Sequence, residues 1–186
     1  MKTYAGCLSD LKQPHAMTIG KFDGMHTGHM ALLKKTVEYA KNLGILSLVF
    51  TFFPNPSAVL CGKPFVPLIS EREKTNILAG MGIDILVNYP FDRQFAAIPP
   101  EQFIKMIFND LECRALVIGE GFRFGKDRKG GVSMLSGAGR VYGAVVEVVK
   151  NIEIDGEPVS SSRIRKAISN NNTALAERLL GRPIRA

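Results

Sequence analysis

Met17-Thr-Ile-Gly-Lys-Phe-Asp-Gly-Met-His-Thr-Gly-His29 is the stretch around which the rest of the chain is organised. A short apolar run meets Gly20 and Gly24 and then a long amphipathic segment, which predicts a strand, a tight loop and a helix. His26 and His29 fall at the helix start, and their spacing of three places both side chains on one helical face. Because the first N–H groups of a helix lack intrahelical partners, the stretch predicts an anion site, with phosphate as the natural ligand.

Other interpretations of this stretch fit the sequence less well. A histidine pair can be half of a metal site, but only His15 remains as a third histidine, and Cys7, Cys61 and Cys113 show no paired ligand spacing. A phosphate loop of the NTPase type would need Ser or Thr where Asp127 stands, and the dinucleotide fingerprint is absent from the first strand–helix turn. We therefore predict no metal site built from protein ligands.

The alternation of strand and helix patterns continues along the chain. Apolar residues recur at helical spacing after the histidines, and Gly44 ends that run, so the helix is expected to bury one face; its core residues are Met30, Leu33, Val37 and Ala40. The run Ile45–Phe52 is apolar throughout, as in a central parallel strand. Further strands are predicted at 17–19, 83–88, 115–119 and 143–149, whereas residues 1–16 are expected to form a loop or a short element. The pattern predicts an α/β fold with a doubly wound parallel sheet of about five strands.

Three further segments follow predicted strands or begin predicted helices. Thr51-Phe-Phe-Pro-Asn-Pro56 ends the second strand; it faces the same crevice as the first loop, or is a simple proline turn. Gly119-Glu-Gly-Phe-Arg-Phe-Gly-Lys-Asp-Arg-Lys-Gly-Gly131 combines bare backbone, aromatic rings and cations, which suits a base-and-phosphate cradle, although a solvated basic loop has the same composition. Ser160-Ser-Ser-Arg-Ile-Arg165 opens a helix, either by plain capping or as a triphosphate clamp.

These segments together resemble one family. Gly20-x-Phe-Asp-Gly-x-His26-x-Gly-His29 is similar to the signature of the FAD synthetase (FMN adenylyltransferase) module of bacterial bifunctional riboflavin kinase/FAD synthetases. The other three segments resemble that family's remaining motifs, with departures at Phe53, Asn55 and Gly121. Leu-Leu-Gly-Arg-Pro183 is similar to the sequence that leads into the kinase, so the resemblance implies one adenylyltransferase domain over 1–186 and no riboflavin kinase domain.

The resemblance implies a Rossmann-like nucleotidyltransferase fold and the reaction ATP + FMN → FAD + pyrophosphate, with the FMN phosphate attacking the α-phosphorus directly. Mg²⁺ is expected on the phosphates, held mostly by nucleotide oxygens and water. The catalytic residues implied are His26, His29, Ser162 and Arg165. The ATP-binding residues implied are Gly20, Phe22, Asp23, Gly24, Gly28, Gly119, Phe122, Phe124, Gly125 and Ser161. The flavin-binding residues implied are Thr51, Pro54, Asn55, Pro56, Gly121 and Arg128. Residues 57–70 are interpreted as a looser stretch able to act as a flap, and 91–104 as scaffold.

Composition limits the other function classes. With 186 residues, 46% hydrophobic and 22% charged, the chain is ordinary for one globular domain. It shows no apolar run long enough for a membrane span and no signal peptide, and its cysteines suit a reducing compartment, so a cytoplasmic protein is expected. The net charge of +7 is dispersed without a dense basic tract, so nucleotides account for it as well as nucleic acid does, and solvated surface residues are a further explanation. The partners expected are the small molecules ATP and FMN, without nucleic acid or membrane. Oligomeric state stays open, as do two alternatives: adenylation of another phosphorylated acceptor, and a non-catalytic nucleotide- or flavin-binding module.

Overall fold

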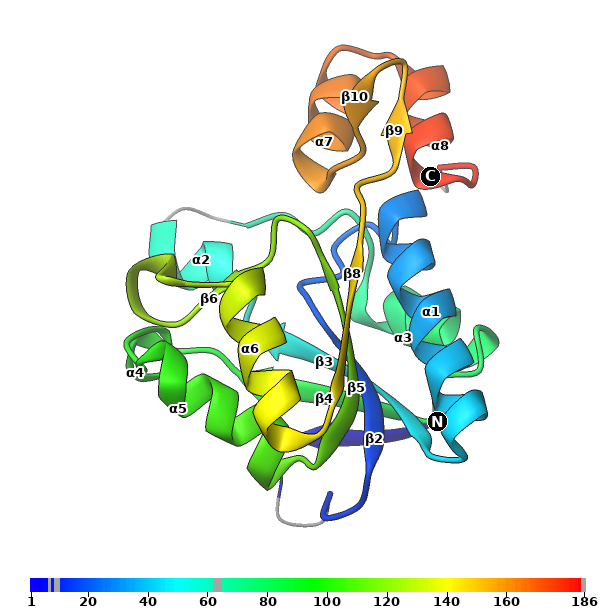
Figure 1. Ribbon diagram of the computed structural model, residues 1–186. Helices are drawn as coiled ribbons and strands as arrows, with labels where there is room; N and C mark the ends of the chain where they lie inside the picture. The colour runs from blue at the N-terminus through cyan, green and yellow to red at the C-terminus, as the bar shows by residue number, and fades with distance from the viewer. Residues whose placement is uncertain (7, 9–10, 62–64, 185–186) are drawn as a thin grey trace.

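A six-stranded parallel sheet forms the centre of the molecule (Figure 1). The computed structural model describes residues 1–6, 8, 11–61 and 65–184. The strand order is β1–β4–β3–β2–β5–β8, and every neighbouring pair is parallel. The strands are β1 (Lys2–Ala5), β2 (His15–Ile19), β3 (Leu46–Phe53), β4 (Ile85–Pro90), β5 (Cys113–Gly119) and β8 (Val145–Val149).

The sheet has six strands where about five were expected, because the first residues form an edge strand. β1 pairs in parallel with β4, with Lys2 opposite Ile85 and Ala5 opposite Asn88. Most of its residues are exposed, as expected for a strand with a neighbour on only one side. Four residues without an alternating apolar pattern give no strand signal of their own, so β1 depends on the sheet edge it joins.

Helices cover both faces of the sheet, which confirms the doubly wound prediction. On one face α1 (Thr27–Leu43) and α3 (Glu71–Gly80) pack over β3 and β4, and Leu33 and Leu78 are fully buried there. On the other face lie α5 (Pro100–Lys105), the π-helical turn η1 (Met106–Asp110) and α6 (Val132–Tyr142). The expected core face of α1 is confirmed: Leu33 and Ala40 are buried, and Met30 and Val37 pack against that core. Gly44 caps the helix with φ 64°.

The direction in which the chain adds strands to the sheet reverses between β2 and β5. From β2 the chain moves outward through β3 to β4 and then returns to the opposite side of β2 to form β5. In open α/β sheets, ligands bind beyond the carboxyl ends of the strands at such a reversal. The segments that follow β2 and β5 are the glycine-rich stretches 20–29 and 119–131, so the topology brings two of the predicted motifs to one place.

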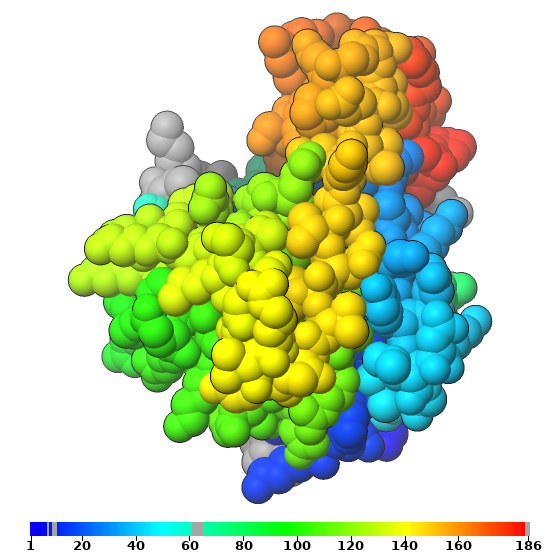
Figure 2. Space-filling model, in the orientation of Figure 1, coloured from blue at the N-terminus to red at the C-terminus, as the bar shows by residue number. Residues whose placement is uncertain are grey.

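The C-terminal part of the chain, from Glu153 onward, adds a small lobe above that edge of the sheet. It contains the hairpin β9 (Glu153–Ile154) and β10 (Glu157–Pro158), then α7 (Ser161–Ser169) and α8 (Thr173–Leu180). Figures 1 and 2 show this lobe, in orange and red, standing beyond the carboxyl ends of the strands beside the first turn of α1. Val159, Ile164, Leu179 and Leu180 form its own small core.

Short elements fill the remaining connections. They are α2 (Pro56–Cys61), α4 (Arg93–Ala96), the two-stranded ribbon of β6 (Arg123–Phe124) with β7 (Gly130–Gly131), and the 3-10 turn η2 (Lys126–Arg128). The expectation of a looser stretch over 57–70 is therefore wrong at its start, where α2 forms. Residues 62–64 of that stretch lie outside the described residues. So does Cys7; Cys113 is buried in β5, as expected of a small apolar side chain.

Candidate nucleotide and flavin site

The loop between β2 and α1 is held in an unusual backbone conformation. Phe22 and Met25 have φ 49° and 43°, and Gly24 between them has φ 83°. Left-handed backbone is strained for residues with a side chain and persists where packing enforces it. Phe22 and Met25 are fully buried, which supplies that packing. The φ of Gly24 favours glycine, and a Cβ there would come within 2.8 Å of Leu68 Cδ1, so the Leu68 side chain would have to shift.

The two predicted histidines meet at the N-terminus of α1. His26 caps the helix, and its Nδ1 accepts a long hydrogen bond of 3.4 Å from the backbone N–H of His29. The imidazole rings are stacked, with centroids 3.6 Å apart and planes 18° apart. With Nδ1 of His26 acting as acceptor, the ring proton of the neutral form is on Nε2. The pair thus places polar ring atoms beside the free N–H groups of the first turn.

Burial keeps both imidazoles neutral in the free chain. It lowers the pKa of His26 to about 4, against a smaller opposing effect of the Asp23 carboxylate. Burial also lowers the pKa of His29 well below its ordinary value, and the nearby charges of His26 and Lys74 lower it further. His29 Nδ1 is buried without a hydrogen-bond partner among the described residues. A buried donor or acceptor without a partner is costly, and a bound anion close to it would remove that cost.

The second helix motif contacts the first loop directly. Arg165 Nη1 forms an ion pair of 2.7 Å with Asp23 Oδ2, and Ser161 Oγ donates to the Asp23 carbonyl at 2.7 Å. The structure therefore joins Asp23 to two other predicted site residues, each more than 130 positions away in sequence. Ser162 lies in the same first turn of α7 with its side chain exposed.

Arg165 also holds the segment before α3. Its Nη2 donates to the Val66 carbonyl at 2.6 Å, and its guanidinium lies 5.0 Å from the centre of the Phe65 ring. Asp23 Oδ1 accepts from the Leu68 N–H at 2.9 Å, so both partners of the ion pair contact this segment. In the ligand-free chain the predicted triphosphate clamp is thus engaged with protein groups, and a nucleotide would have to compete for Arg165.

The third predicted segment borders the same loop. Thr51 is buried, and its hydroxyl donates to the Lys21 carbonyl at 3.3 Å. Asn55 Oδ1 accepts from the Ser57 N–H at 2.9 Å and so caps α2. This capping bond accounts for Asn55 structurally, as the cap of a short helix that begins at Pro56 and not as part of a simple proline turn.

An aromatic cavity of about 740 Å³ lies beside these loops. Its wall includes Gly20 from the first loop, Pro56 from the second, and five predicted site residues from the stretch 119–131. The predicted residues in it are Gly20, Pro56, Gly121, Phe122, Phe124, Gly125 and Arg128. Residues predicted to bind ATP and residues predicted to bind flavin thus share one wall. Gly119 precedes this wall at the end of β5, and Gly28 lies in the first turn of α1.

Sequence reasoning missed part of that cavity. Phe91 and Phe95, interpreted as scaffold, line it together with Phe52 and Phe103. The rings of Phe52 and Phe91 are 5.4 Å apart in an edge-to-face arrangement. The repeated Phe-x-x-x-Phe spacing was the only available signal, and it indicates a common helical face without indicating a cavity.

A second, smaller cavity of about 220 Å³ lies on the other side of Lys21. We call it the loop cavity; it is lined by Phe22 and Asp23 from the first loop and by Pro54 and Asn55 from the second. His26, His29 and Arg165 are not among the described residues that line either cavity, and they lie next to the first loop instead.

Lys74 also lines the loop cavity and was not predicted from sequence. It is 5% exposed, and its ammonium pairs with Glu71 Oε1 at 2.8 Å. The sequence places Lys74 in the first turn of a predicted helix, where lysine is ordinarily a solvated residue. Its burial depends on how α3 packs against the first loop, which local pattern does not reveal.

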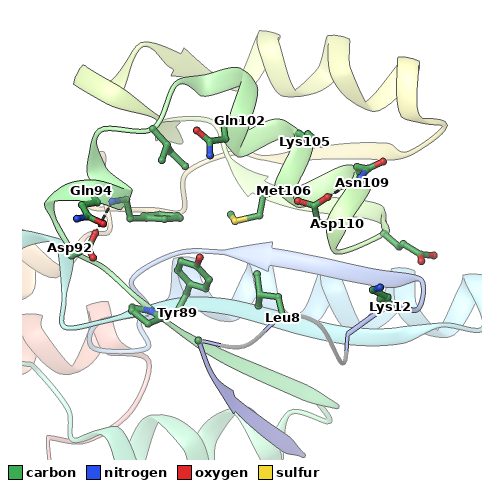
Figure 3. A pocket seen from close by; sticks show the side chains of 15 residues that line it. Leu8, Lys12, Tyr89, Asp92, Gln94, Gln102, Lys105, Met106, Asn109 and Asp110 are labelled. Atoms are coloured by element: carbon green, nitrogen blue, oxygen red, sulfur yellow. Dashed lines mark hydrogen bonds between the residues drawn. The ribbon is translucent and has the colours of Figure 1, made fainter.

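A larger groove, of about 890 Å³, lies elsewhere and contains none of the predicted site residues. Figure 3 shows Gln102, Met106 and Asp110 of the α5–η1 segment on one side of it, opposite Tyr89 and Leu8. This groove lies at the β1–β4 side of the sheet, away from the reversal between β2 and β5. Its size alone does not make it the candidate site, because no residue of the loop between β2 and α1 lines it, whereas both other cavities include residues of that loop.

The described residues contain no helix long and apolar enough to cross a membrane. Within the same part of the chain, no group of three or more His, Cys, Asp or Glu side chains is arranged to hold a metal ion. Asp23, the acidic residue in the first loop, already uses one carboxylate oxygen on Arg165 and the other on Leu68.

Comparison with known proteins identifies relatives. Residues 8–163 match the FAD synthetase family. The bifunctional riboflavin kinase/FMN adenylyltransferase of Escherichia coli K12 is 37% identical over 169 residues, which are 90% of this chain and 54% of that protein. The enzyme of the same description from Pseudomonas fluorescens is 35% identical over 182 residues, or 96% of this chain and 58% of its own length. The chain spans about half the length of these curated relatives.

Solved structures agree on the fold. A Streptococcus pneumoniae protein described as a macrolide-efflux protein superposes with a TM-score of 0.85 at 26% identity, covering 98% of this chain and 60% of that one. A pantoate-β-alanine ligase from Francisella tularensis superposes with a TM-score of 0.59 at 17% identity, covering 94% and 76%. The predicted Rossmann-like nucleotidyltransferase fold is confirmed.

Proposed function

This chain belongs to the FAD synthetase family, and from that membership and the geometry of its site we propose that it transfers AMP from ATP to FMN, giving FAD and pyrophosphate. The observation that carries the proposal is the contact between the two helix-start motifs. Ser161 and Arg165 of α7 hold Asp23 of the loop that leads into the His26–His29 pair. Two helix N-termini and a histidine pair at one place suit a polyphosphate better than any other common ligand.

The chemistry needs no protein nucleophile, because the phosphate of FMN is itself one. The site has to hold two anions together and to stabilise the charge that develops on the α-phosphoryl oxygens and on the leaving pyrophosphate. We assign His26 and His29 to the α-phosphate, as N–H donors whose protonation a bound anion favours. Ser161, Ser162 and Arg165 are assigned to the β- and γ-phosphates, and Gly20, Gly24 and Gly28 to close backbone approach.

The aromatic cavity is assigned to the planar groups. Flat rings stack on aromatic side chains, and Phe52, Phe91 and Phe122 offer such surfaces. A cavity of about 740 Å³ is of the size that takes a drug-sized ligand. We propose that it receives the isoalloxazine of FMN, with Gly121 and Arg128 at its rim. Gly121 stands where the family motif has Asn or Asp, so no side chain is present at that point of the rim. We propose that the backbone of Gly121 contacts the ligand there instead.

Mg²⁺ is part of the proposal as a companion of ATP. The site residues fit an ion held by the nucleotide, because the Asp23 carboxylate is already used by Arg165 and Leu68 and the nearby polar groups are hydroxyls and imidazoles. When bound, the ion would neutralise part of the phosphate charge. The contacts assigned above to His26, His29, Ser161, Ser162 and Arg165 are direct contacts with ATP and do not pass through the ion.

Two alternatives remain open. The same fold can adenylate another phosphorylated acceptor, and the departures at Phe53, Asn55 and Gly121 concern the acceptor side. A non-catalytic flavin- or nucleotide-binding module is the other alternative. The intact His26–His29 pair favours catalysis, because simple binding does not need a group aimed at the α-phosphate.

The direct test is incubation of the purified chain with ATP, Mg²⁺ and FMN, followed by chromatography of the flavins and measurement of pyrophosphate. We expect FAD and pyrophosphate in equal amounts from FMN. Pyrophosphate formed with another phosphorylated acceptor but not with FMN would support the first alternative. Tight FMN binding without pyrophosphate release would support the binding module.

A His29→Ala variant tests the catalytic assignment. Removing a donor that acts on the transition state lowers turnover by ~10²-fold or more. The matched control is His15→Gln, since His15 is also a buried histidine but lies at the start of β2, where its Nδ1 donates to the Leu111 carbonyl at 3.2 Å. Unchanged turnover in His29→Ala, with FAD still formed, would remove His29 from the mechanism.

A further inference from the structure

Lys21 occupies a position that none of the assignments above uses. It is the unspecified residue of the Gly20-x-Phe22 motif, and its side chain is exposed. It lines both the aromatic cavity and the loop cavity, so it stands at the border between them. Phe52 lines both cavities as well, but it offers only an apolar ring. Lys21 is therefore the cationic side chain, among the described residues, shared by the two cavities.

The backbone and side chain of Lys21 are both anchored. Its carbonyl accepts from the Thr51 hydroxyl at 3.3 Å, which ties it to the end of β3. Its ammonium donates to Ser57 Oγ at 3.0 Å, which directs the side chain toward α2. α2 contributes Ala58 to the loop cavity and Pro56 to the aromatic cavity, so this bond keeps the ammonium beside an element that borders both cavities.

Successive residues of the first loop line the aromatic cavity, then the loop cavity, and then begin α1. Gly20 and Lys21 border the aromatic cavity, Phe22 and Asp23 border the loop cavity, and His26 follows at the start of α1. If the flavin ring occupies the aromatic cavity and the α-phosphate of ATP lies at His26, the phosphate of FMN must lie between them. Because Lys21 lines both cavities, it borders the region that such a phosphate would occupy.

The surrounding charges favour an anion at this place. The acidic side chains of the loop cavity are Asp23 and Glu71, and each is already paired, with Arg165 at 2.7 Å and with Lys74 at 2.8 Å. A phosphate arriving there would therefore meet carboxylates whose charge is neutralised by neighbouring cations. Oppositely charged neighbours around a bound phosphate stabilise it, and the effect is larger where water is partly excluded.

We propose that Lys21 binds the phosphate of the flavin acceptor and sets the preference of this site for FMN over riboflavin. The inference rests on the proposed function, because it assumes that the aromatic cavity receives the flavin. It concerns binding of the acceptor, whereas the histidines act on the phosphate of ATP. A charge-assisted hydrogen bond of this kind contributes about tenfold in affinity.

The test compares two ligands that differ only in the phosphate. Quenching of flavin fluorescence gives dissociation constants of FMN and of riboflavin for the intact chain and for Lys21→Gln, Lys21→Arg and Lys41→Gln. Lys41 is the matched control, because it is a lysine in the last turn of α1, a full helix length from the histidines. We expect the intact chain to bind FMN more tightly than riboflavin. In Lys21→Gln that ratio falls by about tenfold, through weaker FMN binding and with riboflavin changed less than twofold.

The controls separate the possible outcomes. Lys21→Arg should keep most of the preference because it keeps the charge, and Lys41→Gln should keep all of it. An equal loss of both flavins in Lys21→Gln would mean a structural role and would overturn the assignment, as would an unchanged ratio. If the intact chain forms FAD while the ratio in Lys21→Gln is unchanged, the proposed function stands and Lys21 is excluded. If the intact chain neither binds flavin nor forms FAD, both proposals fail.

Discussion

The His26–His29 pair defines the chemistry at the scale of single residues. Two imidazoles stacked 3.6 Å apart at a helix N-terminus repel one another when both are protonated, and burial adds to that effect. They are therefore neutral at neutral pH in the free chain. A bound polyphosphate would raise the pKa of both imidazoles, because its negative charge favours their protonated form. The free site is thus prepared to donate N–H groups without carrying a permanent buried charge.

The lowered pKa of His26 has a consequence for stability. Folding lowers the pKa from 6.5 to about 4, so between these pH values the unfolded chain binds more protons than the folded chain. The free energy of unfolding therefore falls as the pH falls from 6.5 toward 4, and the full contribution is present above 6.5. Between pH 7 and pH 5 the loss due to His26 is about 2 kcal/mol.

Urea unfolding of the intact chain and of His26→Gln at pH 7 and at pH 5 measures this loss. The variant lacks the titrating group, so its free energy of unfolding should decrease by about 2 kcal/mol less than that of the intact chain over the same interval. Carboxylates titrate in both proteins and cancel in the comparison. Equal decreases in the two proteins would show that His26 is not buried in its neutral form.

At this scale the sequence predicted positions at helix starts better than contacts. The placement of His26, His29 and Arg165 at the starts of two helices was predictable because residue type and spacing at a helix start carry the signal, whereas their roles stay predictions. The ion pair between Asp23 and Arg165 was not, because it joins two positions that only the sheet topology brings together. Lys74 was missed for the same reason.

At the scale of elements, the terminal lobe is attached to the first turn of α1. Thr27 Oγ1 donates to the Leu179 carbonyl at 3.2 Å, and Arg182 Nη1 donates to the Gly24 carbonyl at 3.1 Å. Gly181 ends α8 with φ 71°, and a Cβ there would lie 2.9 Å from Thr27 Cγ2. The end of α8 and the start of α1 therefore fix one another's position.

Gly181→Ala should disturb this junction. The left-handed φ costs about 1 kcal/mol for a residue with a Cβ, and the contact with Thr27 adds to it, so we expect a loss of about 2 kcal/mol in the free energy of unfolding. Gly143→Ala is the matched control: Gly143 caps α6 with φ 66° and has nothing within 4 Å of the added Cβ.

Both variants are measured by urea unfolding and by the KM for ATP. Gly143→Ala should lose only about 1 kcal/mol and keep its KM. Gly181→Ala should also raise the KM for ATP, because Thr27 begins the helix whose free N–H groups are assigned to the phosphates. Equal effects of the two substitutions would mean that the junction does not position α1.

The strongly patterned elements were predictable and the weakly patterned ones were not. Apolar periodicity predicted α1, and unbroken apolar runs predicted β3 and β5, since their residues are buried on one or both faces. β1 has one neighbouring strand and mostly exposed residues, so it left no pattern to recognise. The helix α2 begins at Pro56 after Asn55, a cap whose signal resembles that of a proline turn.

At the scale of the whole molecule, the sheet reversal determines where the parts of the site can meet. The loops after β2 and β5 open on the same edge, and the lobe of α7 and α8 contacts that edge through Ser161 and Arg165. The aromatic cavity lies beside the first of these loops, so a planar acceptor and a polyphosphate can be held within reach of one another. The fold class was predictable because alternation of strands and helices allows few arrangements. The cavity was not, since its wall combines residues from segments that lie far apart in sequence.

The measurement that tests the central claim most directly follows the α-phosphorus of ATP. The chain is incubated with FMN and with ATP labelled with ³²P at either the α- or the γ-position, and the products are separated. Transfer of AMP predicts that α-label appears in FAD and γ-label only in pyrophosphate, each in amounts equal to the FMN consumed. Label from the γ-position in a flavin, or release of both labels without labelled FAD, would contradict adenylyl transfer to FMN at this site.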